Sequence, residues 1–273
     1  MSERAIVFGA HGGLTGVLSE PEVPIPGKRR AVLVSNIGMH HRAGPFRLYV
    51  KLARRLAAAG VHVLRFDLSG MGDSLPRSDA PTPAGRVAHD LDDAMSWLTE
   101  SAGIEEFILI GLCSGVDSTH AAATLDPRVR GAVFIDGYAY PTPGFYVRKY
   151  SLRFLQPRRW RRYLQRWVRD GRRGDKQLAE ATVFNRELPT KDEFRRDVTK
   201  MTRRGADLLF IYTAGVMHEF NALRQLNEML GPEPDWSHID SEMMPMANHV
   251  FSSAEQRAML LSRLERWVQS LPR

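Results

Sequence analysis

The chain has 273 residues, of which 43% are hydrophobic and 25% charged, and its formal net charge is +7. This composition is that of an ordinary globular protein and excludes the collagen-like, coiled-coil and wholly disordered classes. The single cysteine, Cys113, excludes an internal disulfide framework and a four-cysteine zinc site. No stretch approaches the roughly 18 uncharged apolar residues of a membrane-spanning helix, and residues 1–10 lack the pattern of a signal peptide. We therefore expect a cytoplasmic protein.

Short apolar runs alternate with amphipathic helical stretches along most of the chain. The runs at 5–8 and 14–18 predict an opening hairpin. Ser252 and Glu255 have the spacing of a capping box for the last helix. The alternation predicts an α/β fold with a mostly parallel sheet between helices. We expect further strands at 31–35, 61–68, 107–110, 132–135, 208–212 and 236–241, and helices at 46–57, 83–99, after Cys113, at 219–230 and after Ser252.

The segment 145–204 interrupts this alternation. It holds 19 Lys and Arg against 7 Asp and Glu, while the rest of the chain is net negative. Trp160, Tyr163, Leu164 and Trp167 share one helical face of it. We predict a basic helical cap over the sheet, inserted into a core formed by 1–144 and 205–273. The segment matches no groove-reading motif, so we do not expect nucleic-acid binding, and its charge is typical of a solvated outer face.

Cys113 lies in the sequence Gly111-Leu112-Cys113-Ser114-Gly115, between an apolar strand and a helix. A nucleophile on a tight strand-to-helix turn needs small residues two positions away on either side, because the backbone there is crowded. The glycines have that spacing around Cys113 and not around Ser114. A helix N-terminus also favours the thiolate form of a cysteine. We interpret Cys113 as a nucleophile; the alternative is an inert buried cysteine beside a turn.

The chain resembles the α/β-hydrolase family over nearly its whole length. Residues 67–74 match the D-x-x-G-x-G-x-S loop that this family carries after its fourth strand, Cys113 follows the fifth strand, and His249 precedes the last helix. The resemblance implies an eight-stranded, mostly parallel sheet flanked by helices. The family nucleophile is usually serine, with cysteine in dienelactone hydrolases and polyhydroxyalkanoate synthases. Ser74 belongs to the loop motif, so we do not expect it to be a nucleophile.

The resemblance implies a triad in which a histidine is the base and an acid orients it. His249 is the expected base. Glu219, after the strand at 208–212, lies close to the usual family position of the acid, and Asp136, after the preceding strand, lies where a minority of relatives have it. We keep both, with a slight preference for Glu219.

An acyl-transfer site also needs hydrogen-bond donors for the oxyanion. We expect the backbone N–H groups of Ser114 and Ile37 to provide them. His40 and Tyr138 are candidate substrate contacts. No set of His, Asp and Glu has metal-ligand spacing, so we expect neither a metal nor a cofactor.

These features predict an enzyme that transfers acyl groups through a Cys-His-acid triad. Hydrolysis of an ester or thioester through acyl-Cys113 is the leading interpretation. A thiolate exchanges one thioester for another at little thermodynamic cost, so acyl-coenzyme A and acyl carrier proteins are candidate donors, and the basic segment would suit their phosphates and acidic surfaces. Two alternatives remain: an acyltransferase with a small-molecule acceptor, and a non-catalytic ligand-binding protein on the same fold.

Overall fold

The computed structural model describes residues 1–25, 29–38, 40–154 and 188–272. One mixed sheet forms the centre of the molecule, with its strands in the order β1-β2-β4-β3-β5-β6-β7-β8. β1 and β2 pair antiparallel, β2 joins β4 antiparallel, and all the other pairs are parallel. The strands are Ser2–Phe8, Leu14–Glu20, Arg30–Val34, His62–Phe66, Glu106–Leu112, Val129–Ile135, Asp207–Thr213 and Ile239–Met244, in chain order.

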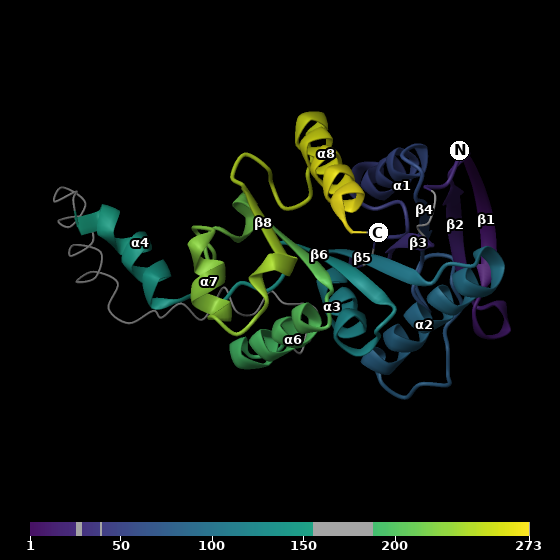
Figure 1. The fold of residues 1–273 in the computed structure, drawn as a ribbon, viewed down its shortest axis with the longest axis horizontal. Coiled ribbons are helices and arrows are strands. Elements are labelled where there is room, and N and C mark those ends of the chain that lie inside the picture. Colours follow the sequence, from purple (N-terminus) through teal and green to yellow (C-terminus); the bar gives the residue numbers. More distant parts are fainter. Residues whose placement is uncertain (26–28, 39, 155–187, 273) are drawn as a thin grey trace, which may run out of the picture.

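Helices cover both faces of this sheet (Figure 1). α1 (Leu48–Ala58) and α8 (Ala254–Ser270) lie on one face, and α2 (Pro83–Ala102), α3 (Gly115–Leu125) and α6 (Lys191–Arg203) lie on the other. The strand side chains alternate accordingly, with Leu33 and Leu109 in the core on the α2 side and Val34 and Ile110 in the core on the α1 side. Such two-sided burial is why the central strands read as continuous apolar runs. The predicted fold class, with eight strands, is confirmed.

Capping residues explain where two of the helices begin. Thr82 accepts a hydrogen bond from the Gly85 N–H and so opens α2, whose first residue is a proline. Ser253, not Ser252, caps α8, because its hydroxyl accepts from the Gln256 N–H at 3.1 Å. The predicted capping box was therefore wrong by one position. Ser252 instead bonds Asn248 within the loop before the helix.

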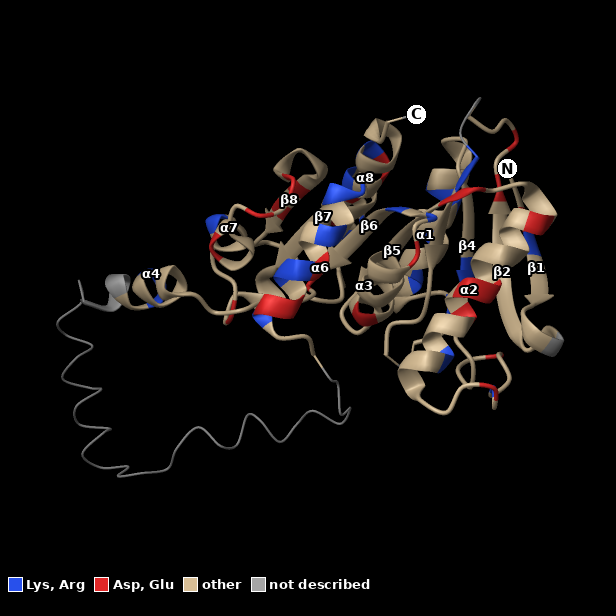
Figure 2. Cartoon of the chain, turned by 60° about the horizontal axis from the view of Figure 1, so that its bottom comes forward, with Lys and Arg blue, Asp and Glu red and all other residues tan. Residues whose placement is uncertain are grey.

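The predicted insertion is described only at its two ends. α4 (Pro143–Phe154) enters it, and Arg148 of this helix pairs with Glu228 of α7 (Arg224–Leu230) at 2.7 Å. The predicted aromatic face at 160–167 lies outside the described residues. α6 lies within the predicted insertion range. It packs against the face of the sheet that α2 and α3 also cover, through Phe194, Val198 and Met201. This helix carries charges of both signs (Figure 2).

Of the described helices, none is long and apolar enough to cross a membrane. The described residues also contain no group of three or more His, Cys, Asp and Glu side chains that could hold a metal ion.

Candidate active site

The loops that follow β3, β5, β6, β7 and β8 meet at one edge of the sheet, because these five strands are neighbours and parallel. Four of these loops carry a candidate residue, and in chain order these residues are Ile37, Cys113, Asp136 and His249. Thr213, the last residue of β7, contacts one of them. In open α/β sheets, ligands bind outside the carboxyl ends of the strands, so this edge is where a site is expected.

Cys113 occupies the sharp turn between β5 and α3. Its φ is 56°, a left-handed conformation that few residues other than glycine adopt, and its N–H donates to the Ile135 carbonyl at 3.0 Å. A side chain at Gly111 would lie 2.4 Å from the Gly115 carbonyl oxygen, and one at Gly115 would lie 3.1 Å from the Asn36 carbonyl oxygen. The two glycines therefore let α3 cross closely over the end of β5. Local strain of this kind is common at functional sites.

His249 lies between Asp136 and Cys113. Its Nδ1 is 2.9 Å from Asp136 Oδ2. Hydrogen bonds from the imidazolium to Asp136 and, next in size, to the Cys113 sulfur raise the pKa of His249 to about 10, against the opposing effect of partial burial. The histidine is therefore protonated at neutral pH, beside the sulfur.

Asp136 is held firmly in place. It follows β6, has a φ of 48°, and its carboxylate is fully buried. Oδ1 accepts the Thr213 N–H at 2.6 Å, and Oδ2 accepts the Thr213 hydroxyl as well as the histidine. The buried charge thus has the hydrogen bonds it needs, and these orient the oxygen that contacts His249.

Among the described residues, the Glu219 carboxylate forms no ion pair with His249. It follows a short 3₁₀ turn after β7, its side chain is about half exposed, and its carboxylate lies 3.8 Å from the imidazole of His218. The helix expected from residue 219 begins only at Arg224. The geometry therefore favours Asp136 over Glu219, against the slight preference drawn from the sequence.

Sequence reasoning missed Thr213 and Gly215. Thr213 is a strand-end residue beside the end of β6, and its role depends on that parallel pairing. Gly215 packs directly under the histidine, since a Cβ there would lie 2.7 Å from His249 Cβ. A glycine two residues beyond a strand was the visible signal, but it is typical of any turn.

We predict that Gly215→Ala displaces His249 and lowers kcat/KM by about 10²-fold, because small misplacements of catalytic groups are costly. Gly215 is exposed, so the melting temperature should change by only a few degrees. Ala214→Ser, at the exposed neighbouring position, is the matched control and should keep wild-type kinetics. Wild-type kinetics in Gly215→Ala would contradict the role given to this glycine.

The loop after β3 lies directly over the cysteine turn. The Gly38 N–H donates to Ser114 Oγ at 2.7 Å, and Ile37 forms a bridge with His40. The backbones of Ile37 and Ser114, the two expected oxyanion donors, are thereby brought close together. His40 is exposed.

Tyr138 is buried, unlike His40. Its hydroxyl donates to Asp117 at 3.0 Å, and its ring packs edge-on against His120 and Phe194. These contacts make Tyr138 part of the packed core under α3 and α6, and they leave its predicted contact with substrate without support from the geometry.

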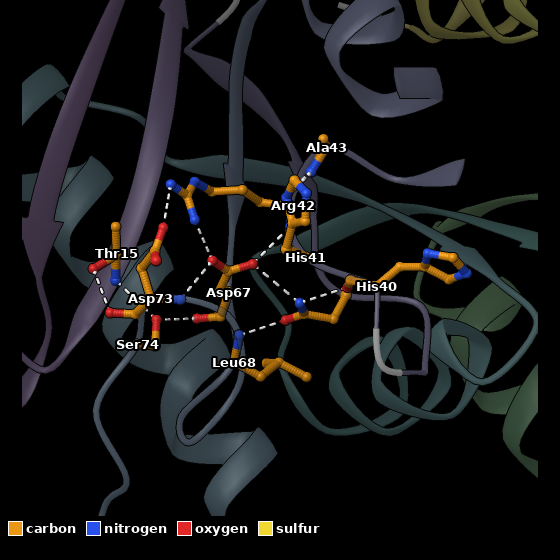
Figure 3. Close-up of polar contacts among 10 residues, drawn as sticks. Thr15, His40, His41, Arg42, Ala43, Asp67, Leu68, Asp73 and Ser74 are labelled. Carbon is orange, nitrogen blue, oxygen red and sulfur yellow. Dashed lines mark hydrogen bonds and ion pairs between the residues drawn. The ribbon is translucent and has the colours of Figure 1, made fainter. Parts of the chain in front are cut away.

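The Asp67 carboxylate holds the loop after β3 in place (Figure 3). Its fully buried carboxylate accepts from the Arg42 backbone N–H at 2.6 Å, from the Arg42 guanidinium and from the Asn36 amide at 3.1 Å. A side chain at Gly72 would overlap this carboxylate, and Ser74 donates to the Asp67 carbonyl at 2.7 Å. The D-x-x-G-x-G-x-S motif therefore anchors the loop that carries Ile37, and Ser74 serves structure.

We predict that Arg42→Met lowers the free energy of unfolding by about 3–5 kcal/mol, since it leaves the buried Asp67 charge without its cation. Asp73→Asn is the matched control. Asp73 also pairs with Arg42, at 2.7 Å, but is 68% exposed, so its loss should cost under about 1 kcal/mol. Urea denaturation measures both, and equal losses would contradict the anchoring role.

Comparison with known proteins agrees with this architecture. The model of the alpha/beta hydrolase family matches residues 31–272, so the chain belongs to that family. Solved structures of similar fold include a lidless α/β serine hydrolase from Xanthomonas campestris (18% identity, 100% of this chain and 98% of that one, TM-score 0.55). Another is an esterase domain from Rhodothermus marinus (17% identity, 98% of each chain, TM-score 0.58). A third is an esterase from Pyrococcus furiosus (12% identity, 98% of this chain and 91% of that one, TM-score 0.62).

Among curated proteins, a polyketide transferase from a Penicillium species is 35% identical over 88 residues. The match covers 31% of this chain and 29% of that protein, so the chain spans under a third of the length of the relative it matches.

Proposed function

We propose that this α/β hydrolase is an acyl-transfer enzyme that hydrolyses acyl esters and thioesters through an acyl-Cys113 intermediate. The observation that carries the proposal is the continuous contact from Asp136 to His249 to Cys113 at the strand-to-helix turn. A nucleophile, a base within hydrogen-bond reach and a third group that orients the base are the components of covalent acyl transfer. Asp136 takes the role of the acid in this proposal.

The reaction would proceed in two halves. The Cys113 thiolate attacks the carbonyl carbon, a C–S bond forms, and the carbonyl electron pair moves to oxygen, where the Ile37 and Ser114 N–H groups stabilise the negative charge. The leaving thiol or alcohol departs with the proton of the His249 imidazolium. Water then attacks the acyl-enzyme while the neutral imidazole takes its proton, and the thiolate leaves as the acid product forms.

The chemistry of the nucleophile favours thioester donors. Attack of a thiolate on a thioester replaces one C–S bond by another, whereas attack on an oxygen ester gives a less stable acyl-enzyme. The esterases of similar fold support oxygen esters as substrates too. Acyl-coenzyme A and acyl carrier proteins are the thioester donors we propose.

Transfer to an acceptor other than water is the second candidate. The partial similarity to a polyketide transferase favours it, because that protein is named as a transferase and not as a hydrolase. An acyl-cysteine remains activated toward amines, alcohols and thiols, so the same site would serve either outcome.

The test uses a thioester and an oxygen ester that carry the same acyl group, each with and without an added amine or thiol acceptor. We expect kcat/KM to be at least about tenfold higher for the thioester, and the free acid to be the main product in water. An acylated acceptor as the main product would replace hydrolysis by transfer. Failure to turn over any donor would overturn the proposed activity and favour a ligand-binding protein.

The raised pKa of His249 predicts a pH dependence. The imidazolium donates the proton to the leaving group, so kcat/KM should remain high until the pH rises through about 10 and then fall. Because Asp136 is the largest cause of the shift, Asp136→Asn should move this descending limb down by more than one pH unit. The measurement is a pH profile of kcat/KM for both proteins, and a wild-type limb near the ordinary histidine value would contradict the assignment.

A further inference from the structure

The end of β7 contacts both of the loops that carry the acid and the base. Thr213 is the last residue of this strand, and its side chain is fully buried. Its N–H and its hydroxyl both donate to the Asp136 carboxylate, in the loop after β6. The N–H of the next residue, Ala214, donates at 3.0 Å to the carbonyl of Ala247, in the loop before α8 that also contains the base. The segment therefore joins the two loops to each other.

The hydroxyl of Thr213 makes two hydrogen bonds whose directions are fixed. The Gly215 N–H donates to Thr213 Oγ1 at 3.0 Å, so the hydroxyl accepts there. An ionised carboxylate can only accept, so the single hydroxyl proton goes to Asp136 Oδ2. Both bonds lead to His249. Asp136 Oδ2 lies 2.9 Å from His249 Nδ1, and a Cβ on Gly215 would lie 2.7 Å from His249 Cβ.

The hydroxyl is needed at this position in a way that the backbone is not. Any residue except proline could supply the N–H that Oδ1 of Asp136 accepts at 2.6 Å. Among the described residues, the Thr213 hydroxyl and the His249 imidazole are the two groups that bond Oδ2. Without the hydroxyl, Oδ2 would be held by the imidazole alone, and the plane of the carboxylate would be free to turn away from it.

We propose that Thr213 is a positioning residue for His249, whose hydroxyl fixes Asp136 Oδ2 opposite Nδ1 and holds the turn at Gly215 against the histidine. The inference rests on the proposed function, in which His249 is the general acid and base. Thr213 acts through Asp136 and Gly215 and takes no part in the transfer of the acyl group. Small misplacements of a catalytic group are costly, so this support should be visible in the rate.

The test is the pH titration of the His249 imidazole by NMR in the full chain, with its signals assigned from their absence in His249→Gln. The bond to Asp136 is the largest cause that raises the pKa of this histidine, followed by the bond to Cys113. Thr213→Val removes the hydroxyl at nearly constant size. We expect the midpoint to fall by about one pH unit, and kcat to fall about tenfold with KM within about twofold of the wild type. Thr213→Ser keeps the hydroxyl and should restore both values.

Thr202→Val is the matched control. Thr202 is also buried, and its hydroxyl likewise donates and accepts, to the Val198 carbonyl at 3.0 Å and from the Asp235 N–H at 3.1 Å. Its loss should lower the melting temperature about as much as that of Thr213→Val, because each variant loses two buried hydrogen bonds. The His249 midpoint and kcat should stay at the wild-type values in Thr202→Val.

Thr213→Ala also lacks the hydroxyl and should lower the midpoint too, so the test does not depend on how well valine is accommodated. A wild-type midpoint in both hydroxyl-free variants, or a midpoint lowered as much in Thr213→Ser, would overturn the inference. Failure of the proposed function looks different. The midpoint would then fall in Thr213→Val and recover in Thr213→Ser, and yet the wild type would turn over no acyl donor.

Discussion

Cys113→Ala is expected to lower kcat by about 10³-fold or more and to abolish acylation of the protein, because the nucleophile is removed and no other residue takes its place. The fold should persist, since alanine fills less space than cysteine and the strained turn depends on Gly111 and Gly115 rather than on the thiol. The measurement is turnover of an acyl thioester, with the melting temperature as a check on folding.

Ser114→Ala is the matched control for that variant. Ser114 is the adjacent residue in the same strand-to-helix turn, so its hydroxyl is the rival nucleophile. In the structure its Oγ accepts a hydrogen bond from the Gly38 N–H, and this bond helps to hold the loop after β3 that carries Ile37. We expect a loss of about tenfold, far smaller than that of Cys113→Ala. A larger loss of activity in Ser114→Ala than in Cys113→Ala would identify Ser114 as the nucleophile.

Asp136→Asn is the second substitution for which we expect a large effect, a fall in kcat of about 10²-fold to 10⁴-fold. Asp136 Oδ2 accepts from His249 and from the Thr213 hydroxyl. An amide nitrogen in that position donates rather than accepts, so it would select the wrong histidine tautomer and remove the charge that stabilises the imidazolium. The variant keeps the size of the side chain, and Oδ1 can still accept from Thr213.

Glu219→Gln distinguishes the two candidate acids. Its carboxylate is about half exposed and lies beside His218, so the variant should keep kcat within about twofold of the wild type. A large loss with Glu219→Gln and a small one with Asp136→Asn would return the acid to the position that the sequence pattern slightly favoured.

Much of the fold was predictable because it depends on local patterns. Continuous apolar runs placed the parallel strands, and the amphipathic stretches between them placed the covering helices. The turn at Cys113 was predictable for the same reason, since the spacing of Gly111 and Gly115 around it reflects a steric requirement within five residues.

The choice of acid could not be made locally. Asp136 and Glu219 both follow strands, and only the neighbouring ends of β6 and β7 bring Thr213 onto Asp136 and leave Glu219 beyond a short 3₁₀ turn. The start of α8 differed by one residue because Ser252 and Ser253 are both good capping residues, and Asn248 bonds the first of them.

Formation of an acyl-enzyme at Cys113 can be observed directly by intact-protein mass spectrometry after brief incubation with acyl-coenzyme A or an activated acyl ester. We expect a mass increase of one acyl group in the wild type, localised to the peptide that contains Cys113, and no increase in Cys113→Ala. An increase that persists in Cys113→Ala, or turnover by the wild type with no acyl group on Cys113 at any time, would contradict it.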